Sequence, residues 1–183
     1  MLVLILSIIS VILVWFIGVL FKRNLLPEII LGFIIGFSWE LTTAPLWNYN
    51  PNSLTLFYIE GEYLSFEVII FWGSVLALLS LMVEFIQKNV LKKSNNVTFL
   101  FSSLILFVFV GWVIEYVGIN YNFWSYSWRF SNFIFGIPAV VIYGWAFASI
   151  LYMPTLKFYR NDIERILRNE SMTWFPKKRL KKV

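Results

Sequence analysis

Long apolar runs separated by short polar segments dominate this chain of 183 residues. Five runs are about as long as the ~20 helical residues needed to cross the ~30 Å hydrocarbon core of a bilayer. Because backbone polar groups in lipid must be satisfied within the segment, each run predicts a helix. We therefore predict an all-α polytopic membrane protein with about five transmembrane helices, at Leu2–Phe21, Glu28–Leu46, Leu64–Gln87, Thr98–Gly118 and Phe133–Met153.

The distribution of positive charge predicts the orientation of these spans. Of the 15 Lys and Arg residues, all except Arg129 fall in alternate connections or after Met153. By the positive-inside rule, the N-terminus is expected outside and the C-terminus inside the cell membrane. Residues 1–155 then form a single transmembrane domain, and residues 156–183 form a basic cytoplasmic tail with a short amphipathic helix. The first run is expected to be a retained helix, since Lys22 and Arg23 follow it and no small-residue cleavage site does.

Composition supports the membrane class and narrows the chemistry. Charged residues make up 14% of the chain, against about 25% in ordinary soluble domains. Cysteine and histidine are absent, and Asp162 is the one aspartate, so we expect no metal, no cofactor and no His-activated nucleophile. The net charge of +5 is explained by topology without a nucleic-acid partner. Any proton chemistry must come from glutamates.

One pattern occurs twice. Gly36-x-x-x-Glu40 precedes Trp47-x-Tyr49, and Gly111-x-x-x-Glu115 precedes Trp124-x-Tyr126. The apolar runs that follow align residues 69–73 with residues 140–144. These matches predict a two-helix pseudo-repeat, at about 28–87 and 98–153. The sequence leaves open whether Glu40 and Glu115 face one pocket.

The two repeated glutamates are the strongest candidates for function. An ionisable side chain inside a bilayer is costly and is by default a functional hypothesis. Burial disfavours the charged form of a carboxyl group, and a neutral glutamic acid is a usable proton donor. Aromatic faces nearby can stabilise a positive charge. The combination predicts metal-independent, acid-initiated chemistry on an alkene, in which water or another double bond captures the carbocation.

Simpler interpretations of several polar and glycine residues stay open. Glu40 and Glu115 can also make structural hydrogen bonds between helices, to hydroxyls such as Thr43 or to backbone carbonyls. Glu84 is expected to pair with Lys88 one turn later. The Gly32-x-x-x-Gly36 spacing predicts close helix packing.

Segments of both halves resemble membrane proteins of carotenoid and terpenoid biosynthesis. The second half resembles the carotenoid-biosynthesis membrane proteins, which include the carotenoid hydratases, at Glu115–Gly118, Asn122–Tyr126, Phe135–Pro138 and Trp145. Trp47-x-Tyr49 and the segment Leu64–Phe71 resemble the lycopene-cyclase membrane domain. Ser38-Trp39-Glu40 resembles the Trp-Glu of small integral-membrane terpene cyclases.

All three groups carry out proton-initiated chemistry on isoprenoids, so the resemblance implies an isoprenoid cyclase or hydratase. The candidate catalytic residues are Glu40, Glu115 and Glu67. The candidate substrate-binding residues are Trp39, Trp47, Asn48, Tyr49, Asn122, Trp124, Tyr126 and Trp128. The expected partners are the bilayer and an apolar isoprenoid-like substrate, and a homo-oligomer is plausible. The competing hypotheses are a binding or transport module for an apolar ligand and a non-catalytic assembly subunit.

Overall fold

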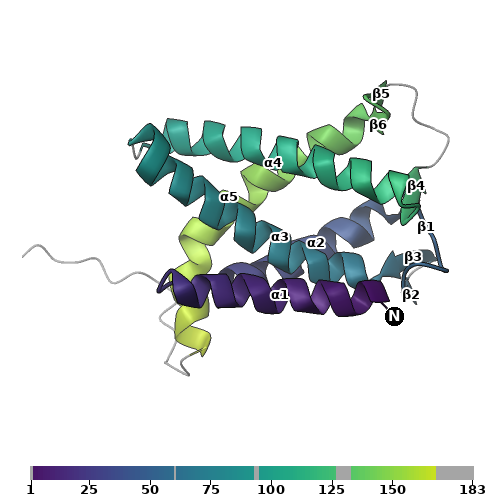
Figure 1. Cartoon of the computed structure of the whole chain (residues 1–183), viewed down its shortest axis with the longest axis horizontal. Helices are drawn as coiled ribbons and strands as arrows, with labels where there is room; N and C mark the ends of the chain where they lie inside the picture. The colour runs from purple at the N-terminus through teal and green to yellow at the C-terminus, as the bar shows by residue number, and fades with distance from the viewer. Residues whose placement is uncertain (1, 60, 93–94, 127–132, 168–183) are drawn as a thin grey trace, which may run out of the picture.

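Five long helices make up most of the protein (Figure 1). The computed structural model describes residues 2–59, 61–92, 95–126 and 133–167. Within that part of the chain, each of the five contains a stretch long and apolar enough to cross a membrane, as predicted, although the fifth helix begins at Ala139 and not at Phe133. The helices are α1 (Leu2–Leu20), α2 (Leu26–Thr43), α3 (Phe66–Phe85), α4 (Asn96–Asn120) and α5 (Ala139–Leu167).

Local sequence signals explain where several helices begin and end. Lys22 has a left-handed backbone (φ 53°), and the chain turns there after α1. Pro27 lies in the first turn of α2, where its missing N–H costs nothing. Ser65 and Asn95 cap α3 and α4 by accepting hydrogen bonds from the N–H groups of the first turn. A π-helical segment, Ile86–Leu91, extends α3.

Helix α5 is longer than the sequence predicted. The expected span ended at Met153, with a separate amphipathic helix after it, whereas α5 continues through Pro154 to Leu167. The apolar face does not stop at the proline, because Leu156 is buried in the core and Ile163 packs against it. Burial of that face therefore outweighs the backbone hydrogen bond that Pro154 removes. The rest of the predicted tail, residues 168–183, lies outside the described residues.

Three short two-stranded ribbons, which the all-α prediction omitted, lie toward the end of the bundle where α1 begins (Figure 1). A short 3-10 helix, Ala44–Leu46, leads from α2 into β1. The ribbons pair β1 (Trp47–Tyr49) with β4 (Trp124–Tyr126), β2 (Leu56–Ile59) with β3 (Glu62–Ser65), and β5 (Phe133–Ile134) with β6 (Ile137–Pro138). The β1–β4 ribbon is formed by the two Trp-x-Tyr motifs themselves.

Glycines allow the helices to approach closely around the core. A Cβ on Gly32 would lie 2.9 Å from the Cα of Gly73, so α2 and α3 nearly touch there, as the glycine spacing predicted. A Cβ on Gly36 would lie 2.2 Å from the Cβ of Trp72. In the other half, a Cβ on Gly111 would lie 2.2 Å from the indole ring of Trp145. Gly36 and Gly111 thus each make room for a tryptophan of another helix.

We predict that Gly36→Ala destabilises the protein. The added methyl group has no space beside Trp72, and overpacking of this kind costs ~1–3 kcal/mol. Thermal unfolding in detergent measures the effect. Ile34→Phe adds more volume on the outward face of the same helix, where Ile34 is 57% exposed, and should leave the unfolding temperature nearly unchanged. Equal effects of the two substitutions would contradict the close packing.

An ionic cluster closes the opposite end of the bundle. Glu28, at the start of α2, is fully buried, and its Oε1 lies 2.6 Å from Nη2 of Arg23 and 3.4 Å from Nε of Arg160 on α5. Arg23 also donates to Glu84 on α3. Glu84 therefore pairs with Arg23, and the expected pair with Lys88 is replaced. The cluster joins the α1–α2 connection, α2, α3 and α5.

We predict that Glu28→Gln destabilises the protein more than Glu84→Gln does. Removing one partner of a buried ion pair costs ~3–5 kcal/mol, because the other charge stays buried without compensation. The Glu84 side chain is 33% exposed, so water replaces much of what its substitution removes. The comparison is made by thermal unfolding in detergent. A larger effect at Glu84 would contradict the role of Glu28.

Candidate functional site

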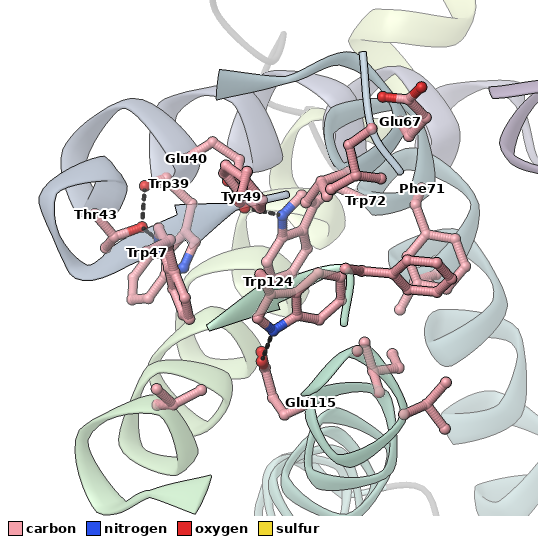
Figure 2. A pocket seen from close by; sticks show the side chains of 18 of the residues that line it. Trp39, Glu40, Thr43, Trp47, Tyr49, Glu67, Phe71, Trp72, Glu115 and Trp124 are labelled. Carbon is pink, nitrogen blue, oxygen red and sulfur yellow. Dashed lines mark hydrogen bonds between the residues drawn. The ribbon is translucent and has the colours of Figure 1, made fainter. Parts of the chain in front are cut away.

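A single cavity collects the main sequence-predicted side chains. Its volume is about 430 Å³, and residues from all five helices and from β1 and β4 line it. Glu40 and Glu115 both line this cavity, which answers the question that the sequence left open (Figure 2). Most of the other lining residues are aliphatic or aromatic, including Trp39, Trp47, Tyr49, Phe71, Trp72, Trp124 and Trp145.

Glu40 lies near the end of α2 and is 2% exposed. Its Oε1 accepts a hydrogen bond of 2.8 Å from the indole Nε1 of Trp72 on α3. Its Oε2 accepts a hydrogen bond from the hydroxyl of Tyr49 on β1. Both carboxyl oxygens are therefore occupied by neutral donors from other elements.

Glu115 lies near the end of α4, is 6% exposed, and has three donors. Its Oε1 accepts from Nε1 of Trp145 on α5 at 3.0 Å. Its Oε2 accepts from Nε1 of Trp124 at 3.0 Å and from the hydroxyl of Tyr126 at 2.6 Å, both on β4. Each glutamate is thus held by the strand that follows its own helix and by a tryptophan of a neighbouring helix.

The β1–β4 ribbon places the two aromatic motifs against each other. The antiparallel register sets Trp47 opposite Tyr126 and Tyr49 opposite Trp124. Their rings lie together as well, with centroids 5.3 Å apart for the first pair and 6.5 Å for the second. The pairing brings both tyrosine hydroxyls within hydrogen-bond distance of the two glutamates that line the cavity.

Trp72 and Trp145 complete the site, and the sequence analysis did not assign them to it. Their rings stack with centroids 4.7 Å apart and an interplanar angle of 27°, and each donates to a different glutamate. The predicted alignment of the two halves set Trp72 against Tyr143, which is 70% exposed. The residue that makes the equivalent contact, to Glu115, is Trp145, two residues further on. In the sequence, only the family resemblance singles out Trp145.

Neutral donors, not cations, compensate the two carboxyl groups. Among the described residues, no lysine or arginine forms an ion pair with Glu40 or Glu115. Burial, followed by the neighbouring Glu40, raises the pKa of the Tyr49 hydroxyl well above its usual value. Burial and Glu115 likewise raise the pKa of Tyr126. Both phenols therefore keep their protons and can act as donors.

The alternative hydroxyl partners of Glu40 bond elsewhere. The hydroxyls of Ser38, Thr42 and Thr43 donate to backbone carbonyls one turn earlier on α2. Thr43 also accepts a hydrogen bond of 2.9 Å from Nε1 of Trp47. The carboxyl group is therefore held by aromatic donors.

Glu67 lines the cavity but is occupied by the loop before α3. Both of its carboxyl oxygens accept from the backbone N–H of Thr55 at 2.9 Å, and Oε2 also accepts from Ser65 at 3.1 Å. Its carboxyl group is directed away from Glu115 in Figure 2. These contacts indicate that Glu67 anchors the loop.

The remaining candidate residues occupy different positions. Tyr126 contacts the cavity through Glu115, and Trp39 lines the cavity directly. Asn48 is exposed on β1, opposite Ser125. Asn122 has a left-handed backbone (φ 55°), and its carbonyl accepts from Asn50, so it shapes the turn before β4. Trp128 lies outside the described residues.

No protein-family model, curated protein or solved structure matches this chain.

We predict energetic coupling between Glu40 and Trp72. A double-mutant cycle with Glu40→Leu and Trp72→Phe should give an interaction energy of ~0.5–3 kcal/mol, as for residues in direct contact. Unfolding of the four proteins in detergent provides the energies.

Trp47→Phe supplies the matched control, because Trp47 donates to Thr43 and not to Glu40. Its cycle with Glu40→Leu should give an interaction energy below ~0.5 kcal/mol. Stronger coupling of Glu40 to Trp47 than to Trp72 would refute the observed arrangement.

Proposed function

We propose that this protein is a multi-pass enzyme of the cell membrane, with its N-terminus outside and its C-terminus inside. The alternation of positive charge along the sequence supports this orientation. The connection after α1 and the connection after α3 both carry basic residues, and they lie at the same end of the bundle. The positive-inside rule therefore assigns both connections to the same, inner side of the membrane. The glutamate site then lies in the outer half of the membrane.

We also propose that the two halves are a pseudo-repeat. Four features support it: a glycine one turn before each glutamate, a tryptophan packed on that glycine, a Trp-x-Tyr strand after each helix, and the pairing of the two strands. Membrane proteins built from such repeats commonly place their site at the interface between the repeats. Here that interface is the stack of Trp72 on Trp145.

The function that the site supports best is acid-initiated cyclisation or hydration of an isoprenoid or carotenoid-type alkene. The observation that carries this proposal is the presence of two buried glutamates, without cationic partners among the described residues, in one cavity lined by tryptophans. A neutral carboxyl group there can protonate a double bond, and the second carboxylate can take a proton from the product. Indole faces would stabilise the intervening carbocation.

The proton balance of this reaction needs no further reactant besides water. Protonation of one alkene carbon leaves the positive charge on its neighbour. In a cyclisation, a second double bond attacks that carbon and a proton is lost to the carboxylate. In a hydration, water attacks and its surplus proton goes to the carboxylate. The apolar lining suits a long hydrocarbon chain entering from lipid.

A binding or transport module for an apolar ligand is the second candidate. The observation that favours it is that all four carboxyl oxygens of Glu40 and Glu115 already have donors. A satisfied network of this kind can simply rigidify a ligand site. The two candidates differ in whether the glutamates are needed for turnover or only for the shape of the cavity.

The test is lipid analysis of a heterologous host that makes a panel of linear isoprenoids. The wild-type protein should yield a cyclised or hydrated product. Glu40→Gln and Glu115→Gln should each lower its amount by ~100-fold or more, in the range expected for loss of a general acid or base. Chromatography with mass spectrometry identifies and quantifies the product at matched expression.

Glu62→Gln is the matched control, since Glu62 lies on β3 outside the hydrogen-bond network, and it should leave the product unchanged. A product unaffected by either buried glutamate would refute the two-carboxylate mechanism. Retention of a bound isoprenoid by the purified protein, without any product, would favour the binding module.

A further inference from the structure

The two glutamate networks are alike except at one contact. Each glutamate accepts from a tyrosine of the following strand and from one of the two stacked tryptophans. The tryptophans of the Trp-x-Tyr motifs differ: Trp124 donates to Glu115, whereas Trp47 donates to Thr43. Within the part of the chain that the structure describes, Glu115 therefore has three donors and Glu40 has two.

One sequence difference at the contact itself matches this contrast, beside the spacing from glutamate to tryptophan, which is seven positions in the first half and nine in the second. The residue three positions after Glu40 is Thr43, and the residue three positions after Glu115 is Gly118. The hydroxyl of Thr43 accepts the indole N–H of Trp47. A Cβ on Gly118 would lie 2.0 Å from Cζ2 of Trp124, so only glycine leaves room for that ring to reach Glu115. Both Thr43 and Gly118 line the cavity.

The identity of the donors restricts where a proton can sit. An indole N–H can donate but never accept, whereas a phenol hydroxyl can do either. Both oxygens of Glu115 face an indole N–H, from Trp145 and from Trp124. Oε1 of Glu40 faces the indole of Trp72, while its Oε2 bonds to the Tyr49 hydroxyl. Of the four oxygens, Oε2 of Glu40 alone bonds to no indole N–H of the described residues.

We propose that Thr43 and Gly118 give the two glutamates different protonation states. Glu40 holds a proton on Oε2, and Glu115 stays a carboxylate. When Oε2 carries the proton, the Tyr49 hydroxyl can turn from donor to acceptor. Protonating Oε2 of Glu115 would turn its O–H toward the Tyr126 hydroxyl and would weaken the hydrogen bond that this oxygen accepts from the indole N–H of Trp124, a cost that Oε2 of Glu40 does not have. Among the described residues, Trp124 also gives Glu115 one donor more than Glu40 has.

In the reaction, Glu40 is then the acid and Glu115 the carboxylate that faces the cation and removes its proton. That catalytic meaning rests on the function proposed above. The protonation states themselves rest only on the contacts within the site. Thr43 is a positioning residue in this scheme, since it acts on Glu40 by holding Trp47 away from it.

Infrared spectroscopy of the full-length protein in lipid nanodiscs at neutral pH tests the assignment without a substrate. A protonated carboxyl group gives a C=O band that is separate from carboxylate bands and shifts in deuterated water. We expect one such band from the cavity, lost in Glu40→Gln and retained in Glu115→Gln. Loss in Glu115→Gln alone, or no band dependent on Glu40, would overturn the proposal.

Two tryptophan substitutions form a matched pair that tests whether the additional indole donor of Glu115 causes the difference in protonation. Trp124→Phe removes the third donor of Glu115 and leaves its Oε2 facing only a hydroxyl. We expect a second protonated C=O band, which the additional Glu115→Gln substitution abolishes. Trp47→Phe removes the corresponding indole N–H of the other half and should leave the spectrum with its single band. A second band in both variants, or in neither, would overturn the role assigned to this contact.

Gly118→Ala and Thr43→Ser test the two residues that create the asymmetry. The alanine methyl group should move Trp124 away from Glu115 and produce the same second band as Trp124→Phe. Serine keeps the acceptor for Trp47 and should preserve the wild-type spectrum. Size-exclusion chromatography identifies any variant that fails to fold. If Gly118→Ala fails to fold, Trp124→Phe tests the same contact in its place. If the expected infrared bands are found but the protein turns over no isoprenoid, the proposed function is refuted. The assigned protonation states of Glu40 and Glu115 would still hold.

Discussion

The need to satisfy two carboxyl groups inside an apolar bundle governs the half of this structure that holds the β1–β4 ribbon. A buried polar group without a partner costs several kcal/mol in apolar surroundings, and a buried charge costs more. Glu40 and Glu115 meet this requirement through indole and phenol donors contributed by neighbouring helices and by the β1–β4 ribbon. Pairing of the two Trp-x-Tyr strands delivers both hydroxyls at once, so the ribbon and the carboxyl groups depend on each other.

Close helix packing serves the same network. Gly36 and Gly111 each lie one turn before a glutamate and leave room for the tryptophan that donates to it. Two indoles in such positions meet and stack, which joins α3 and α5 at the centre of the bundle. Glycine, tryptophan and glutamate therefore act as one unit in each half, and a substitution at any of them affects the other two.

Periodicity and composition were sufficient to predict the five helices and the two glutamates, because long apolar runs and an ionisable residue within them are local signals. The strand pairing was not predictable in the same way, since three-residue strands depend on a partner about 75 residues away in the sequence. The alignment of residues 69–73 with 140–144 also missed the match of Trp72 with Trp145. Apolar residues in a sequence carry little information about how two helices align. Which indoles donate to the glutamates depends on contacts between helices, which the alignment does not contain. Helix α5 continues beyond its predicted end because burial of Leu156 outweighs the tendency of Pro154 to end a helix.

The protein buries glutamates in two different ways, and the contrast bears on function. Glu28 is paired with Arg23 and Arg160, so it has fixed counter-charges that tie helices together. Among the described residues, Glu40 and Glu115 have only neutral donors, which can satisfy a carboxylate without a fixed counter-charge. Stability alone would be served by the first arrangement at both ends, or by apolar residues of similar size. The second arrangement leaves a carboxyl group free to gain and lose a proton, as the proposed function requires, and it is the one that lines the cavity.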